Sequence, residues 1–220
     1  MRMRRKKNLD IHLAECGVYY SELREDSLDL RKEEYHPIDV EALFNRHAPI
    51  LLEIGCGKGA FAIELAKRFP EYNIIAVEKC KNVILTACQN AKEQNISNLR
   101  FFCGGAEYLH RHLPKNSVER IFLNFSCPFP KNKYAMHRLT SPVFLPVYKT
   151  LLKKDGEIHQ KTDHPRLFEF SIEHLTNAGF KLKNVTVDLH NSGFEGNIMT
   201  EYEQMFVNMG KPIYRLEAYM

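Results

Sequence analysis

The sequence predicts an α/β protein with a mostly parallel sheet and helices on both of its faces. From residue 49 onward, short apolar runs alternate with segments whose apolar residues recur at helical spacing. Such alternation requires crossover connections and therefore parallel strands. The first apolar run passes into a glycine-rich turn, as expected where a buried strand leads into a helix. Near the end of the chain the alternation stops, which favours an antiparallel hairpin at the edge of the sheet.

The expected elements follow from these patterns in chain order. Strands are predicted over residues 50–54, 73–77, 99–103, 118–125 and 156–162, and helices over 60–69, 82–94, 144–152 and 167–177, with a short helix ending at residue 109. Residues 180–189, 204–208 and 214–219 are expected to complete the sheet as strands. Ligands bind such sheets at the carboxyl ends of the strands, so site residues are expected directly after residues 54, 77, 103, 125 and 162.

The composition is that of an ordinary globular chain, with 44% apolar and 26% charged residues in a length of 220. We expect a basic N-terminal arm and extension over residues 1–48 and one folded domain over residues 49–220. No apolar run reaches the ~20 residues that span a bilayer. The basic start is not followed by the apolar core of a secretory signal. The sequence therefore predicts a cytoplasmic protein without a membrane partner.

The positive charge is concentrated at the N-terminus, where residues 1–7 read M-R-M-R-R-K-K, although the net charge of the chain is only +4. Such an arm suits the phosphate backbone of a nucleic acid. A solvated tail without a binding role is the alternative interpretation.

The six cysteines show no metal-binding pattern. They form no C-x-x-C pair, and no cysteine–histidine cluster has the spacing of a zinc site. Without a secretory signal, free thiols are expected rather than disulfides. The sequence thus predicts no metal.

The most informative motif is L-L-E-I-G-C-G-K-G over residues 51–59. Glycines at 55, 57 and 59 let the backbone turn sharply and approach a ligand closely. The G-x-G-x-G spacing differs from the G-x-G-x-x-G of dinucleotide folds, and the residue after Lys58 is not the Ser or Thr of a phosphate-binding Walker loop. With Glu53 at the end of the strand, this segment resembles motif I of class I methyltransferases. The alternative is a tight turn that binds nothing.

Two further strand ends carry candidate cofactor contacts. Glu78 ends the second strand, where a carboxylate can accept hydrogen bonds from both hydroxyls of a ribose. An ordinary exposed acid is the alternative. The third strand ends in C-G-G-A at residues 103–106, the turn that faces adenine in class I methyltransferases. Because Gly105 has no side chain to accept the adenine amino group, only backbone contacts are expected there.

The fourth strand end, N-F-S-C-P-F-P-K at residues 124–131, is a proline-locked loop suited to holding a flat base. G-E-I-H-Q-K-T-D follows at 156–163, and the D-L-H to T-E-Y-E segment lies at 188–203. With these motifs the chain resembles the bacterial tRNA (guanine-N7)-methyltransferases over its whole length. The resemblance implies a Rossmann-like class I methyltransferase fold with a seven-stranded sheet, S-adenosylmethionine as cofactor, and tRNA as partner. The implied reaction is methyl transfer to N7 of a guanine in the tRNA variable loop. Separately, the protein is expected to be a monomer or a homodimer.

The resemblance also assigns residues. It implies cofactor contacts at Glu53, Gly55, Gly57, Gly59, Glu78, Gly105, Ala106 and Asn124. It implies substrate contacts at Lys131, Asp163, Thr200, Glu201, Tyr202 and Glu203, with Asp163 as the catalytic candidate.

The chemistry of guanine N7 explains why carboxylates are expected at the site. N7 carries a lone pair and no proton, so methyl transfer needs no general base, and a carboxylate stabilises the positive charge that develops on the purine. If residues 200–203 are extended, Glu201 and Glu203 face the same side, where they can accept the N1 and N2 protons of guanine. Two solvated surface acids are the alternative.

Three departures from the family pattern motivate a second hypothesis. The loop aspartate of the family is Cys127 here, its tryptophan is Phe129, and Gly105 stands at the adenine position; Asn132 also interrupts the basic residues after the loop. Loss of one preorganised charge costs about 10²–10³-fold in rate. The chain would then be an impaired or redirected relative that binds S-adenosylmethionine or RNA without efficient N7 transfer.

Two other reaction classes are disfavoured. A covalent role for Cys127 in pyrimidine C5 methylation would require an activated thiolate, and nothing else nearby specifies a pyrimidine. A nicotinamide oxidoreductase conflicts with the glycine spacing and with the T-E-Y-E segment.

Overall fold

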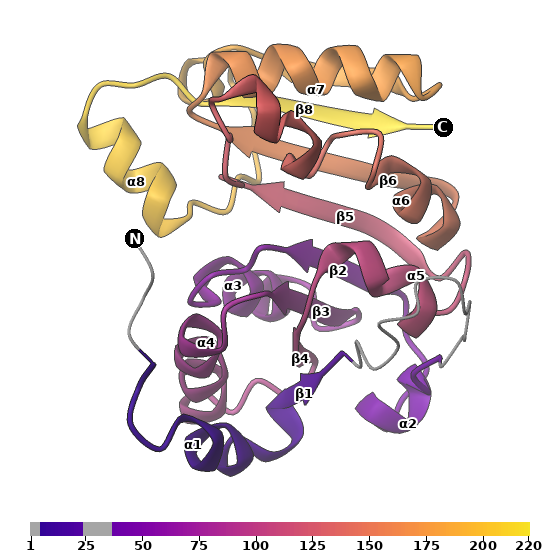
Figure 1. Cartoon of the computed structure of the whole chain (residues 1–220), viewed down its shortest axis with the longest axis vertical. Coiled ribbons are helices and arrows are strands. Elements are labelled where there is room, and N and C mark those ends of the chain that lie inside the picture. Colours follow the sequence, from indigo (N-terminus) through magenta and orange to yellow (C-terminus); the bar gives the residue numbers. More distant parts are fainter. Residues whose placement is uncertain (1–4, 24–36) are drawn as a thin grey trace. The chain divides into compact units, whose positions relative to one another are not determined.

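The computed structural model describes residues 5–23 and 37–220, which fall into two compact units divided between Pro114 and Lys115 (Figure 1). Residues 1–4 of the basic arm and residues 24–36 of the expected extension lie outside the described residues. The division expected between residues 48 and 49 stays a prediction.

The first unit is built on four parallel strands in the order β1-β4-β3-β2. The strands are β1 (Tyr20–Glu22), β2 (Ile50–Ile54), β3 (Asn73–Glu78) and β4 (Leu99–Cys103). The helices are α1 (Leu9–Glu15), α2 (Val40–Phe44), α3 (Ala60–Arg68), α4 (Lys81–Glu93) and α5 (Leu109–His112), with 3-10 turns η1 (Gly17–Tyr19) and η2 (Ala106–Tyr108). Every residue of β2 and β4 is buried, as expected for the near-continuous apolar runs of a parallel sheet.

Local chemistry explains the boundaries of the helices in this unit. The side chain of Asp39 caps α2 by accepting a hydrogen bond from the Ala42 N–H at 2.9 Å. α3 ends just before Pro70, because a proline disfavours helical backbone in the residue that precedes it. Part of the basic arm is fixed to α4, since Lys6 bonds Asn82 through its backbone N–H (3.0 Å) and Thr86 through its ammonium (3.1 Å).

The second unit has four strands in the order β5-β6-β8-β7. They are β5 (Val118–Asn124), β6 (Leu152–Thr162), β7 (Lys181–Thr186) and β8 (Tyr214–Tyr219); β5 is parallel to β6, and β8 is antiparallel to both of its neighbours. The helices are α6 (Leu145–Leu151), α7 (Pro165–Asn177) and α8 (Glu201–Asn208), with 3-10 turns η3 (Asn132–His137) and η4 (Leu189–Asn191). Its core includes Leu123, Ile158, Leu175 and Leu216, all less than 1% exposed.

The predicted α/β class with mostly parallel strands is confirmed, and so is the alternation up to α7. Two expectations were wrong. The described residues contain eight strands rather than seven, because the short segment β1 pairs with β4. Residues 204–208 are helical rather than a strand, because Thr200 and Glu203 form a capping box that starts α8. The antiparallel pairing at the end of the chain therefore joins β8 to β7 and β6.

Within the part of the chain that is described, no helix combines the length and apolar character needed to cross a membrane.

Candidate active site

The glycine loop leaves β2 in a conformation that ordinary side chains rarely adopt. Gly55 and Gly57 have φ of +83° and +58°, and no atom beyond the adjacent residues lies within 4 Å of where a Cβ on either residue would stand. Gly59, at φ +81°, packs so closely that a Cβ would lie 2.8 Å from Cβ of Ala87 on α4. The loop is thus fixed on the helix side and open to a ligand at its two leading glycines.

Glu78 at the end of β3 is joined to this loop. Its Oε2 accepts a hydrogen bond from the Gly57 N–H at 3.2 Å, and its Oε1 accepts one from the Cys80 N–H at 2.8 Å. Each carboxylate oxygen has a second lone pair, so the group can also accept hydrogen bonds from two hydroxyls of a ligand. The structure therefore brings together Glu78 and the glycine loop, as the sequence predicted.

Glu53 and Cys56 line the buried side of the same turn. Glu53 is 2% exposed on β2. Burial raises the pKa of the Cys56 thiol well above its usual value, and the negative charges of Glu53 and Glu78 raise it further. Cys56 is therefore a neutral, unreactive thiol rather than a nucleophile.

The turn after β4 contains an acid that the motif comparison missed. Gly105 and Ala106 are buried, as expected for a close approach of backbone and ligand. The position that a Cβ on Gly105 would occupy is filled by the carboxylate of Glu107, whose Oε2 lies 2.5 Å and Oε1 2.8 Å from it. Glu107 thus supplies a carboxylate where Gly105 lacks a side chain. The acid two residues downstream was the signal in the sequence that could have identified it.

In the second unit, the loop after β5 is held by a buried arginine. Arg138, 7% exposed, donates hydrogen bonds to the carbonyl oxygens of Pro128 (2.9 Å) and Phe129 (3.0 Å). Phe125 and Phe129 have positive φ of 49° and 41°, a strained conformation for bulky residues that persists only where the surroundings impose it. Sequence reasoning missed Arg138, because its partners are backbone atoms that no motif reveals.

The predicted site residues of this loop differ in exposure. Asn124 ends β5 as a buried residue, whereas Cys127 and Lys131 are exposed. The Phe125 N–H bonds the Lys161 carbonyl at 2.8 Å and so ties the start of the loop to β6.

Asp163 directly follows β6 and lies near side chains of α8 and of the segment that follows it. Its Oδ2 is 3.2 Å from Nζ of Lys211, and that ammonium lies 4.6 Å from the ring centre of Phe206 on α8. The ring of Phe206 is in turn 5.8 Å from that of Phe125. The sequence predicted Asp163 but not Phe206 or Lys211.

The T-E-Y-E segment is not extended as expected but forms the first turn of α8. The Thr200 hydroxyl accepts a hydrogen bond from the Glu203 N–H at 2.9 Å, which completes one half of the capping box. Thr200 and Glu203 are buried, whereas Glu201 and Tyr202 are exposed, Tyr202 by 60%. The expectation that both acids face the same side is therefore wrong, because helical geometry separates them.

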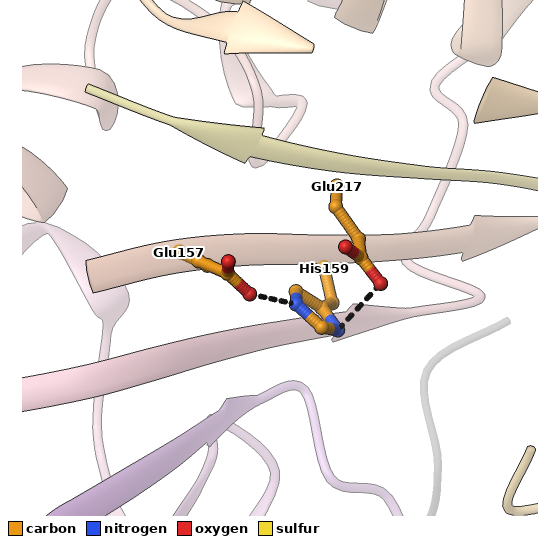
Figure 2. A group of neighbouring side chains, drawn as sticks. All are labelled: Glu157, His159 and Glu217. Carbon is orange, nitrogen blue, oxygen red and sulfur yellow. Dashed lines mark hydrogen bonds and ion pairs between the residues drawn. The ribbon is translucent and has the colours of Figure 1, made fainter. Parts of the chain in front are cut away.

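One cluster in the second unit has metal-ligating residue types. Glu157 and His159 on β6 and Glu217 on β8 offer ligand atoms within 4.8 Å of one another (Figure 2). Nε2 of His159 lies 2.7 Å from Glu157, whereas Nδ1 faces Glu217 at 3.8 Å, so the two carboxylates address opposite sides of the ring. Lys183 pairs with Glu157, and Arg215 pairs with Glu217. These cations neutralise the carboxylates, so the arrangement is that of an ion-pair network. That the protein holds no metal stays a prediction.

Comparisons with known proteins show the family to which the chain belongs. A family model described as "Putative methyltransferase" matches residues 47–216. A tRNA (guanine-N(7)-)-methyltransferase of Macrococcus caseolyticus is 47% identical over 192 residues, which cover 87% of this chain and 90% of the relative. One from Listeria monocytogenes is 41% identical over 218 residues, or 99% of this chain and 98% of the relative. The chain belongs to the tRNA (guanine-N(7)-)-methyltransferase family.

Solved structures support the fold expected for this family. A 16S rRNA methyltransferase superposes with a TM-score of 0.62 over 85% of this chain and 94% of its own, at 16% identity. An antibiotic-related methyltransferase superposes with the same TM-score of 0.62 over 83% of this chain and 93% of its own. At such low identity the likeness shows the class I methyltransferase fold alone.

Proposed function

We propose that this protein transfers the methyl group of S-adenosylmethionine to N7 of a guanine in the variable loop of tRNA. The observation that carries the proposal is its membership of the tRNA (guanine-N(7)-)-methyltransferase family, by a match that covers 99% of the chain in one relative. The open glycine loop joined to Glu78 through the Gly57 N–H supports it. Because the substrate is tRNA, we place the activity in the cytoplasm.

The residues of the first unit fit an adenosyl group. Gly55 and Gly57 leave space above the loop, Glu78 has acceptors for two ribose hydroxyls, and Glu107 provides an acceptor at the turn assigned to adenine. When bound, the cofactor supplies a methyl group activated by a sulfonium. The proposed contacts in the first unit are Glu53, Gly55, Gly57, Gly59, Glu78, Gly105, Ala106 and Glu107. The cofactor contact expected at Asn124 stays a prediction.

The second unit provides the groups proposed to hold the guanine and the RNA. Lys131 is exposed and suited to a phosphate, so that tRNA binding weakens with salt. Glu201 and Tyr202 are exposed at the start of α8, where Glu201 can accept the N1 and N2 protons of guanine. Asp163 stabilises the positive charge that appears on the purine as N7 is alkylated. Reaching these groups requires the base to leave its stack.

Cys127 bears on the rate rather than on the type of reaction. It is exposed in the loop where the family resemblance expects an aspartate. The protein still has one carboxylate nearby, that of Asp163, which follows the carboxyl end of the neighbouring strand β6. An aspartate at 127 would add a second negative charge, so we expect Cys127→Asp to accelerate transfer.

The test is incorporation of labelled methyl groups into unmodified tRNA. The modified position is mapped by borohydride reduction and aniline cleavage, which break the RNA chain at N7-methylguanosine. We expect incorporation by the natural protein, a cleavage in the variable loop, and faster incorporation by Cys127→Asp. If neither protein labels tRNA, the substrate assignment is wrong; if the label lies outside a guanine N7, the reaction assignment is wrong.

A further inference from the structure

A buried ion pair joins α8 to the sheet of the second unit. Lys161 lies near the end of β6 with a side chain 7% exposed, and Glu203 lies in the first turn of α8 with a side chain 0% exposed. Their charged atoms are 2.5 Å apart. The Lys161 ammonium also donates to the Ile198 carbonyl at 2.7 Å and to the Asn197 side chain at 3.1 Å. The segment that leads into α8 therefore wraps around the ammonium of Lys161.

The acceptor sites of Glu203 are filled by groups of the protein itself. Its Oε2 lies 2.5 Å from Lys161 and 3.4 Å from the Thr200 N–H, and its Oε1 lies 2.6 Å from the Asn197 amide and 3.1 Å from Nε2 of His190. A carboxylate offers about four lone-pair sites. These contacts, together with complete burial, leave Glu203 no acceptor for the N1 and N2 protons of a guanine.

The same pair fixes where α8 lies. Lys161 is on β6, which is bonded to β5 on one side and to β8 on the other, so its backbone is held rigidly. Beyond the other end of α8, Lys211 contacts Asp163, the residue directly after β6. α8 is thus attached at both ends next to the carboxyl ends of β5 and β6 (Figure 1). This attachment determines the position of the exposed residues Glu201 and Tyr202.

We infer that Glu203 is a positioning residue: its ion pair with Lys161 holds α8 so that Glu201 and Tyr202 meet the guanine, while Glu203 itself contacts no substrate. This inference rests on the proposed function. Removing one partner of a buried ion pair leaves an uncompensated charge, whereas replacing both partners is often nearly neutral. A contact with substrate behaves differently, because its loss is not repaired by changing Lys161.

The experiment is a double-mutant cycle with Lys161→Met, Glu203→Gln and the variant that carries both. The kcat and KM for tRNA are measured by methyl incorporation, and the dissociation constant of S-adenosylhomocysteine is measured by calorimetry. We expect each single substitution to lower kcat/KM for tRNA. If the two losses were independent, kcat/KM of the double variant would fall by their product; we expect it to be about tenfold or more above that value. Affinity for S-adenosylhomocysteine should stay unchanged within about twofold, because the effect is confined to α8.

Two controls make the cycle specific. Glu201→Gln removes an exposed acid that the proposal places against guanine, and Lys161→Met should not repair its loss. Glu64→Gln removes one partner of the exposed ion pair with Arg68 in α3 and should leave kcat/KM within about twofold.

Additive losses at Lys161 and Glu203 would overturn the inference and assign Glu203 to the substrate. A parallel loss of S-adenosylhomocysteine affinity would also overturn it, since the pair would then act on the whole fold. If Lys161→Met does not fold, the tRNA affinity of Glu203→Gln is compared for guanine and for inosine, which lacks the N2 amino group, at the target position. A loss of affinity that depends on the N2 amino group would refute the inference. A loss that is the same for both bases supports it. Absence of methyl transfer by the natural protein would instead refute the proposed function.

Discussion

The glycine loop of the first unit and the α8 segment of the second unit present ligand-binding groups by opposite means. The loop does so with backbone: Gly55 and Gly57 leave open space, and the Gly57 N–H orients Glu78. The α8 segment does so with side chains, since the buried Lys161–Glu203 pair fixes the helix that carries Glu201 and Tyr202. A backbone site depends on local conformation, whereas a side-chain site depends on contacts between distant parts of the chain. The two regions should therefore respond differently to substitution and to pH.

The largest effect is expected at Asp163, which belongs to the side-chain region. Asp163→Asn removes the carboxylate proposed to stabilise the charged purine, so kcat for tRNA should fall by about 10²–10³-fold. Calorimetry should show unchanged affinity for S-adenosylhomocysteine, because Asp163 lies outside the glycine loop. If Asp163→Asn retains most of its kcat, the stabilising charge comes from another residue and the catalytic assignment is wrong.

The next effect tests the backbone region. Gly57→Val places a branched side chain at φ +58° and into the open space above the loop, so affinity for S-adenosylhomocysteine should fall by about 10–100-fold. Gly179→Val is the matched control, because Gly179 also has positive φ and open space but follows α7. The control should lose thermal stability and keep its cofactor affinity. Equal affinities in the two variants would contradict the assignment of the loop.

A smaller effect is expected from Glu107, the side chain that fills the space beside Gly105. Glu107→Gln should lower affinity for S-adenosylhomocysteine about tenfold, as for loss of a hydrogen bond to a charged group. The natural protein should prefer this ligand to S-inosylhomocysteine, which lacks the adenine amino group. Glu107→Gln should show a smaller preference, because a neutral amide oxygen is a weaker acceptor than a carboxylate. Glu93→Gln, at an exposed position of α4, serves as the control. An unchanged preference would mean that Glu107 does not contact adenine.

The same contrast explains what the sequence could predict. The glycine loop, Glu78 and most elements follow from local patterns, because strands and helices of a parallel sheet have distinct periodicities. β1 was missed because a strand of three residues is too short to show the alternation of apolar and polar residues that identifies a strand. Residues 204–208 were assigned to a strand from their apolar character, although the T-x-x-E capping signature lies directly before them. The role of Glu203 was beyond local patterns, because its partner Lys161 is 42 residues away.

The last effect concerns the pH dependence of stability rather than binding or rate, and it involves the ion-pair network of the second unit. Burial lowers the pKa of His159 from 6.5 to about 4, although the hydrogen bond that its ring donates to Glu157 acts to raise it. Between pH 6.5 and pH 4 the unfolded chain therefore binds a proton that the folded chain does not, and the free energy of unfolding should decrease as the pH falls through this window. A single group changes the free energy of unfolding by at most about 1.4 kcal/mol per pH unit. The pKa of Glu157 is lowered from 4.5 by Lys183 and His159 despite its burial, so its contribution begins to be lost only below about pH 4.5, at the acid end of this window. Urea unfolding across this range should show a shallower slope for His159→Gln than for the natural protein. Equal slopes would mean that His159 is protonated in the folded protein, which would make the two carboxylates of Figure 2, rather than burial, its dominant influence.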